Sequence, residues 1–63
     1  MTKLRDLEHH LRAHGCELLR EGAKHAVWGN PPERKRATVP RHSEIPPTTA
    51  RAICRQLGVP DVE

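Results

Sequence analysis

The apolar positions of residues 2–14 repeat with the period of an α-helix. Three leucines at i, i+3 and i+7 share one face of this helix: Leu4, Leu7 and Leu11. We expect Thr2 to cap its start, because a threonine hydroxyl there can accept a hydrogen bond from a free backbone N–H group. Gly15 is expected to end it.

A second helix is predicted near the end of the chain. We expect Thr48 or Thr49 to cap it, and it runs to about Leu57 before Gly58 and Pro60 terminate it. Four residues form its apolar face: Ala50, Ile53, Cys54 and Leu57.

Three short strands are predicted between the helices, over residues 16–20, 25–28 and 35–39. Gly22 lies in the turn between the first two, where a tight reversal needs backbone freedom. Residues 29–32 are predicted to form a loop, because their consecutive prolines lack the N–H groups of a strand ladder.

The order helix, three strands, helix indicates an α+β fold with a three-stranded antiparallel meander. Both amphipathic helices need a partner for their apolar faces, so we expect them on the same face of the sheet. In the first strand, alternation predicts Leu18 and Arg20 on one face and Leu19 on the other. The second sheet face is left open for a ligand or a partner protein.

Composition limits the classes of protein that remain. Sixty-three residues, 35% of them hydrophobic, fit one domain over residues 1–63 and exclude folds that need a second lobe. No apolar run reaches the roughly 20 residues that span a bilayer, and no signal-peptide core follows Met1, so no membrane association is expected. Two cysteines are too few for a disulfide scaffold, which favours a cytoplasmic location.

Positive charge is concentrated in the middle of the chain. Residues 20–55 carry eight lysines and arginines against three acids, whereas the flanks carry three against five. A basic centre is typical of a domain that contacts a phosphate backbone. A surface that is merely soluble can also carry this excess of basic over acidic residues.

His25 is the strongest candidate for chemistry. It follows the glycine turn beside Lys24, where a histidine can exchange a proton near neutral pH. RNA carries its own nucleophile, the 2′-hydroxyl, so a ribonuclease can work with a base, an acid and a stabilising cation, without a metal or cofactor. The alternative is a structural strand histidine. His10 and His14 are spaced to share a metal, but the sequence supplies no obvious third ligand.

Arg41 and His42 follow the third strand directly. The start of one antiparallel strand lies beside the end of the next, so we expect both residues near Lys24 and His25 at one sheet edge. His42 is a second acid or base, a phosphate contact, or only a solvated loop residue.

A second basic group, Arg34, Lys35 and Arg36, lies at the tip of the next hairpin. These side chains can bind phosphates, or they can simply keep the turn soluble. Trp28 can stack on a base if it faces the open side, and otherwise belongs to the core. Cys16 and Cys54 are interpreted as small buried hydrophobic residues.

Four segments follow one another in a distinctive order, over residues 15–20, 22–28, 38–42 and 49–58. Together they resemble the HicA toxins of bacterial toxin–antitoxin pairs. The most diagnostic parts are the histidine after the glycine turn, the Val-Pro-Arg-His loop at residues 39–42, and Gln-Leu-Gly at residues 56–58. In many members the histidine is the second residue after the glycine, whereas His25 is the third residue after Gly22. Ala23 also stands where a small hydroxyl residue is common.

The resemblance implies a fold like a double-stranded-RNA-binding domain, with the order α-β-β-β-α. It implies metal-independent cleavage of mRNA, with His25 as the catalytic residue, and a HicB-type antitoxin as the protein partner. RNA is expected to lie across the open sheet face and to contact six residues: Lys24, Arg34, Lys35, Arg36, Arg41 and His42. The alternatives are a non-catalytic RNA-binding module of the same fold and a protein-interaction domain for an acidic partner.

Overall fold

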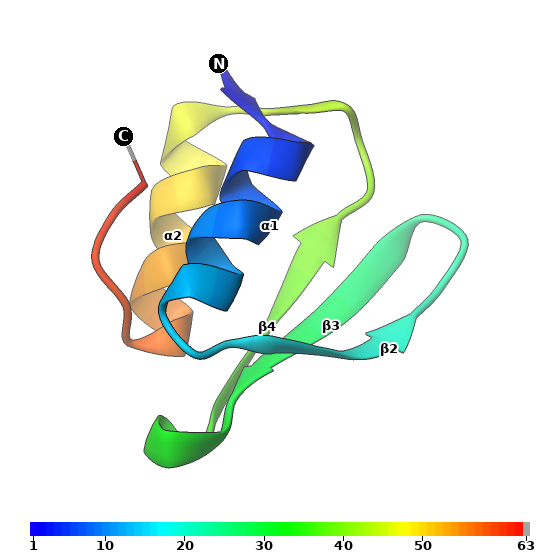
Figure 1. The fold of residues 1–63 in the computed structure, drawn as a ribbon. Helices are drawn as coiled ribbons and strands as arrows, with labels where there is room; N and C mark the ends of the chain where they lie inside the picture. Colours follow the sequence, from blue (N-terminus) through cyan, green and yellow to red (C-terminus); the bar gives the residue numbers. More distant parts are fainter. Residues whose placement is uncertain (63) are drawn as a thin grey trace.

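Two helices and a three-stranded antiparallel sheet dominate residues 1–62, the part of the chain that the computed structural model describes (Figure 1). The strands of this sheet are hydrogen-bonded in the order β2-β3-β4. The predicted α+β fold is therefore confirmed. The elements in chain order are β1 (Thr2–Lys3), α1 (Leu4–Ala13), β2 (Glu17–Glu21), β3 (His25–Asn30), the 3-10 helix η1 (Pro31–Glu33), β4 (Lys35–Pro40), β5 (Glu44–Ile45) and α2 (Pro47–Leu57).

Both helices lie on the same side of the sheet and share one hydrophobic core with it (Figure 1). In the antiparallel register of β3 and β4, Ala26 pairs with Val39 and Trp28 pairs with Ala37, and all four side chains are buried. The helices contribute the residues that their apolar periodicity predicts: Leu7, Leu11, Ala50, Ile53, Cys54 and Leu57. Within the described residues, neither helix is long and apolar enough to cross a membrane.

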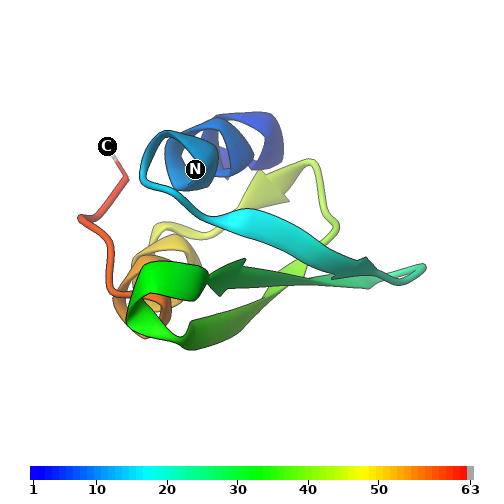
Figure 2. The same ribbon diagram turned by 60° about the horizontal axis from the view of Figure 1, so that its bottom comes forward.

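No helix among residues 1–62 covers the opposite face of the sheet. Because side chains alternate along a strand, His25, Val27 and Gly29 of β3 face this open side. Their partners on β4 include Thr38 and Arg36, which are exposed. The β2–β3 turn projects beyond the helices, so the first residue of β3 lies near a free end of the sheet (Figure 2).

The predicted start of the first helix is wrong. Thr2 does not cap it, because Thr2 pairs with Ile45 in the short β1–β5 ladder and α1 begins only at Leu4. The N–H group of Leu4 donates to the carbonyl oxygen of Ser43 at 2.9 Å. A distant segment therefore satisfies a helix-start donor that the sequence pattern assigned to a side-chain cap.

The predicted cap of the second helix is also wrong. Neither Thr48 nor Thr49 caps it, because α2 already begins at Pro47, with Pro46 in the extended cap position. Proline is favoured at the first helical position, where its missing N–H group would have no helical partner. At the other end Gly58 adopts a φ of 73°, and the Val59 N–H group donates to the Cys54 carbonyl at 3.0 Å, so the predicted glycine stop is confirmed.

Strand β3 continues two residues further than the sequence predicts. Gly29 pairs with Arg36 and Asn30 pairs with Lys35 before the two prolines start η1. The prolines themselves lack N–H groups, but the two residues before them, Gly29 and Asn30, can still pair with β4. The buried Asn30 side chain also donates from Nδ2 to the Leu57 carbonyl at 2.6 Å, which joins this end of the sheet to the end of α2.

A β-bulge between Leu18 and Arg20 changes the expected faces of β2. Leu18 pairs with Trp28 and faces the helices, but Arg20 pairs with Val27 and therefore lies on the open side. The expectation that Leu18 and Arg20 share a face is thus wrong, because the extra residue of a bulge shifts the alternation. Leu19 lies on the face opposite Leu18, as predicted; this is the open side, where its side chain lies over Gly29.

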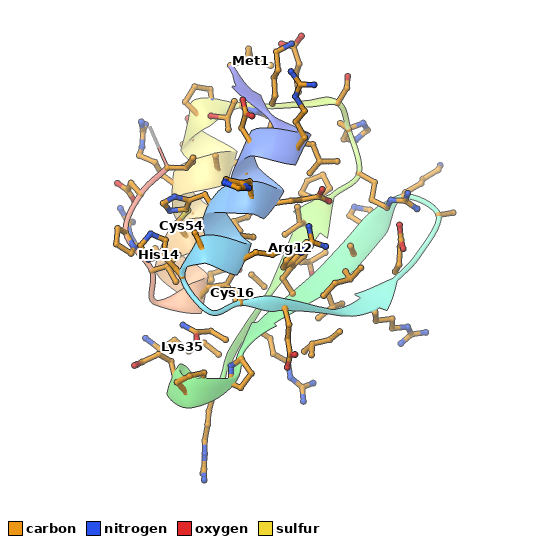
Figure 3. All side chains as sticks on the ribbon, viewed as in Figure 1. Met1, Arg12, His14, Cys16, Lys35 and Cys54 are labelled. Carbon is orange, nitrogen blue, oxygen red and sulfur yellow. The ribbon has the colours of Figure 1, made fainter. Side chains whose placement is uncertain are left out.

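Both cysteines are buried in the core as free thiols, as the sequence predicts. They come from the segment before β2 and from α2, and both are labelled in Figure 3. Burial raises the pKa of each thiol, Cys16 and Cys54, because removal from water disfavours the charged thiolate.

Candidate functional site

His25 is exposed at the first position of β3. It pairs with Pro40 at the end of β4, so both lie at the sheet end that carries the β2–β3 turn. The strand alternation directs its side chain toward the open face, together with Val27 and Gly29. An exposed imidazole at this position can reach a ligand on the open face.

The turn before His25 is held by a close backbone contact. The Gly22 N–H group donates to the His25 carbonyl oxygen at 2.7 Å. A Cβ atom at residue 22 would lie 2.9 Å from that same oxygen, which is closer than a carbon side chain tolerates. The glycine is therefore required by the space between the two backbones, and it determines where His25 begins the strand.

Arg41 braces this turn from the neighbouring strand. Its N–H group donates to the Lys24 carbonyl at 2.9 Å, and its Nη1 donates to the Gly22 carbonyl at 2.8 Å. Its Nη2 also lies 2.9 Å from Glu21 Oε2 in an exposed ion pair. The expected proximity of Arg41 to the histidine turn is thus present. The guanidinium already has two partners there, which makes it a positioning group for the turn.

Lys24 and His42 lie at the same end of the sheet. Lys24 is the residue before β3, and His42 follows Arg41 just beyond β4. Both side chains are exposed. This end of the open face therefore brings together the histidine and basic residues that the sequence places there.

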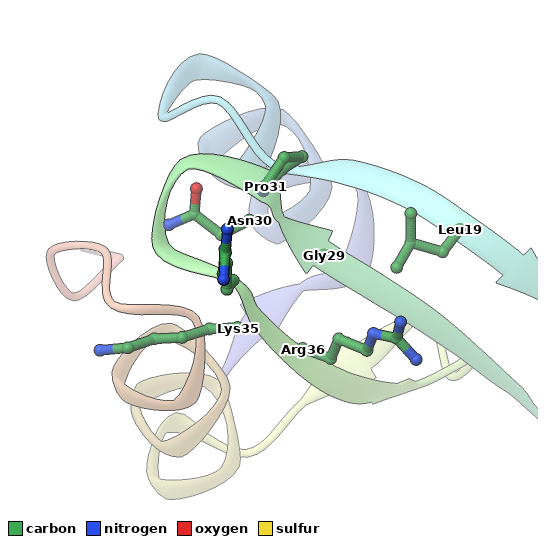
Figure 4. A pocket seen from close by; sticks show the side chains of 7 residues that line it. Leu19, Gly29, Asn30, Pro31, Lys35 and Arg36 are labelled. Carbon is green, nitrogen blue, oxygen red and sulfur yellow. The ribbon is translucent and has the colours of Figure 1, made fainter.

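The three basic residues at the β3–β4 tip do not act as one group. Arg36 pairs with Gly29 and lies on the open side, whereas Lys35 pairs with Asn30 on the helix side. The Lys35 side chain runs past Gly58, and its Nζ would lie 3.1 Å from a Cβ atom there. Figure 4 shows Lys35 and Arg36 extending in opposite directions. Arg34 stands between them, with a left-handed φ of 55°.

A shallow pocket of about 400 Å³ opens beside Arg36. Leu19 and Gly29 form part of its lining, and Pro31 and Arg34 border it from η1 and the residue after it (Figure 4). Sequence reasoning did not single out Leu19 or Gly29 as site residues. Nothing local in the sequence marks the bulge that places Leu19 over Gly29.

Trp28 belongs to the core and cannot stack on a base at the open face. Its side chain is fully buried and pairs across the sheet with the buried Ala37. The guanidinium carbon of Arg12, which extends from α1 (Figure 3), lies 4.9 Å from the Trp28 ring centroid. Of the two alternatives for Trp28, the structure selects the core residue.

The histidines of α1 lie away from the open face. His10 Nε2 is 2.7 Å from the Pro60 carbonyl oxygen, and the ring centroids of His10 and His14 are 4.6 Å apart. No cluster of three or more metal-ligating side chains occurs within residues 1–62. Within residues 1–62, His10 therefore contacts a backbone carbonyl, and no third metal ligand lies beside His10 and His14.

The electrostatic character of the open face follows from these placements. The ion pair of Arg41 with Glu21 is the only one among residues 1–62, so Arg34 and Arg36 have no carboxylate partner there. The face thus has an exposed histidine with Lys24 at one end and, at the other, two arginines that form no ion pair within residues 1–62. Such a surface can bind an extended anion and exchange a proton with it at one end.

Comparison with known proteins identifies the family. The family model described as the HicA toxin of bacterial toxin–antitoxin systems matches residues 4–59, which covers α1 through the end of α2. Searches of curated proteins and of solved structures gave no match. A toxin of such a system implies an antitoxin partner. The matched span also contains the histidine turn and both basic ends of the open face, and this chain therefore belongs to the HicA toxin family of bacterial toxin–antitoxin systems.

Proposed function

We propose that this toxin is a metal-independent endoribonuclease that cleaves mRNA, with His25 as its catalytic acid or base. The observation that carries the proposal is the exposed imidazole of His25 on the open face, at the end braced by Gly22 and Arg41. The reaction it suits is attack of the RNA 2′-hydroxyl on the adjacent phosphorus, with departure of the 5′-oxygen. His25 either takes the 2′ proton or gives one to the leaving oxygen.

The charge distribution supports an RNA strand along the open face. Lys24 and His42 lie near the reacting phosphate at the His25 end, and the Arg41 charge lies close to them. Arg34 and Arg36 lie at the far end and have no carboxylate partner among residues 1–62. Lys35 contributes positive charge to the same end of the sheet, although its side chain runs toward the end of α2. In this proposal the phosphate backbone neutralises these cations.

The antitoxin that the family implies is, in our proposal, a HicB-type protein that blocks the open face. Access of mRNA to His25 requires this face to be free, so a protein seated on it inhibits cleavage without altering the catalytic residue. The toxin acts in the cytoplasm, where mRNA is present.

A cleavage assay in EDTA tests the catalytic role. Wild-type toxin, His25→Ala and His9→Ala are compared on one mRNA, with His9→Ala as the matched control because His9 is exposed on α1. We expect His25→Ala to lose roughly 10²–10⁴-fold in rate, the usual contribution of an acid–base group, and His9→Ala to cleave normally. Equal cleavage by all three would overturn the role of His25. RNA that stays intact but is bound would favour a binding module.

A further inference from the structure

The pocket at the far end of the open face is separate from the histidine turn. Strand β3 runs from His25 to Asn30, and Gly29 is four residues from His25. At about 3.4 Å per residue the two positions are roughly 14 Å apart along the strand. A phosphate that reacts at His25 and a group held beside Gly29 therefore belong to different nucleotides.

The pocket combines an apolar floor with three basic residues, Arg34, Lys35 and Arg36. Leu19 is 46% exposed although it is a large apolar side chain, and it lies over Gly29 because glycine leaves it room. Pro31 continues the apolar lining, and Arg34 and Arg36 border it. Neither arginine is paired with a carboxylate within residues 1–62.

We propose that this pocket is a binding subsite for a nucleotide of the RNA strand other than those at the cleaved bond. The apolar floor of Leu19, Gly29 and Pro31 receives the base or ribose, and Arg34 and Arg36 hold the flanking phosphate. Guanidinium groups suit this role because they bind phosphate oxygens bidentately. The subsite rests on the proposed ribonuclease function and extends it, since it gives the bound RNA a second fixed point.

The surroundings favour RNA over a protein segment as the occupant. An apolar pocket for a protein side chain does not need two unpaired arginines at its border, whereas a nucleotide presents a flat apolar surface and an anionic group together. Glu17 is the residue of β2 that pairs with Gly29, but its carboxylate does not line the pocket. The cations at the border are therefore available to an anionic ligand.

Two pocket variants and one control test the subsite. Arg36→Ala removes a proposed phosphate contact. Gly29→Ala fills the floor, because its methyl group would lie 2.6 Å from Leu19 Cδ1 and would displace that flexible side chain. Arg51→Ala is the control, since Arg51 is an exposed arginine on α2, outside the open face. Circular dichroism and thermal melting establish that each variant is folded.

Binding is measured by fluorescence anisotropy on a labelled single-stranded RNA longer than the open face. We expect Arg36→Ala to bind about tenfold more weakly, the effect of one charged hydrogen bond. The slope of log affinity against log salt should fall by about 0.7, the contribution of one single-strand phosphate contact. Gly29→Ala should weaken binding roughly fivefold with no change in salt slope, and Arg51→Ala should match the wild type.

Cleavage of a dinucleotide separates this subsite from the catalytic proposal. A dinucleotide is too short to reach from His25 to the pocket, so kcat/KM on the long RNA relative to kcat/KM on the dinucleotide should fall in both pocket variants and keep the wild-type value in Arg51→Ala. If the wild type cleaves and binds the long RNA but the pocket variants bind it equally well, the subsite is wrong and the ribonuclease stands. If the wild type binds RNA without cleaving it, the catalytic proposal fails, and the anisotropy values alone decide the subsite. If the wild type does not bind RNA, both proposals are overturned.

Discussion

The N–H group of Gly22 donates a 2.7 Å hydrogen bond to the carbonyl oxygen of His25 across the β2–β3 turn. The contact leaves no space for a side chain on residue 22, because a Cβ atom there would lie 2.9 Å from the same oxygen. The position of the proposed catalytic histidine thus depends on a residue whose contribution is the absence of a side chain.

Gly22→Ala should impair cleavage through the backbone of His25. The carbonyl oxygen belongs to the β3 backbone and cannot move alone, so the turn must open and displace the imidazole. We expect a loss of about 100-fold in kcat, the effect of a misplacement of roughly 1 Å in a catalytic group. Steady-state kinetics measures it, with Ala23→Ser in the same turn as the control. Undiminished kcat in Gly22→Ala would show that the turn does not position His25.

Arg41→Lys should be nearly as harmful as Arg41→Ala. Arg41 bonds the Gly22 carbonyl through Nη1 and Glu21 through Nη2, and a lysine ammonium lacks the fork that reaches both. We expect either variant to lower kcat about tenfold, because a charged hydrogen bond to the turn is lost. If lysine restored the wild-type rate, Arg41 would act on the phosphate as a simple charge.

Glu21→Gln separates the ion pair of Arg41 from its bond to the backbone. The ion pair is exposed on both sides, and exposed pairs contribute only about 0.2–1 kcal/mol. The variant keeps the Arg41 bond to Gly22, so we expect kcat to change by less than about fivefold. A loss as large as that of Arg41→Lys would make the ion pair the element that holds the turn.

Asn30→Ala should destabilise the fold without touching the His25 end. The buried Asn30 amide donates to the Leu57 carbonyl at 2.6 Å, and its removal leaves that acceptor without its partner. We expect a loss of about 1–3 kcal/mol in the free energy of unfolding, measured by urea denaturation followed through Trp28 fluorescence. Asn30→Asp is the comparison, and it should cost more because the carboxylate cannot donate and is charged. An unchanged urea midpoint in Asn30→Ala would contradict this role.

The two cysteines should make the fold less stable at alkaline pH. Burial raises the pKa of Cys16 and Cys54 in the folded state, so the unfolded thiols lose their protons first as pH rises. The folded state then binds more protons, and the stability from this difference is complete below the ordinary thiol pKa and is lost as pH rises through the folded values. Urea midpoints over this range should fall more steeply for the wild type than for a Cys16→Ala, Cys54→Ala variant. Parallel curves would exclude the thiols as the cause.

The sequence alone determined the elements whose signals are local. The leucine spacing of α1 and the apolar stripe of α2 are set by side-chain period. They predict the residues that the structure buries, except that Leu4 at the start of α1 is only partly buried. The end of α2 was also predictable, because the left-handed φ of Gly58 depends on the residue type at that position and on no distant partner. Arg41 was expected beside the histidine turn because antiparallel pairing of β3 and β4 leaves no other place for it.

Only the tertiary structure decided the features that depend on distant partners. Thr2 joins a ladder with Ile45 instead of capping a helix, because a backbone partner from the other half of the chain competes for this segment. The bulge in β2 moves Arg20 to the open side and leaves Leu19 over Gly29. Lys35 and Arg36 are adjacent in sequence, but Lys35 runs beside the end of α2 and Arg36 lies on the open face. Periodicity describes one strand or helix at a time, whereas these placements are set by contacts between elements.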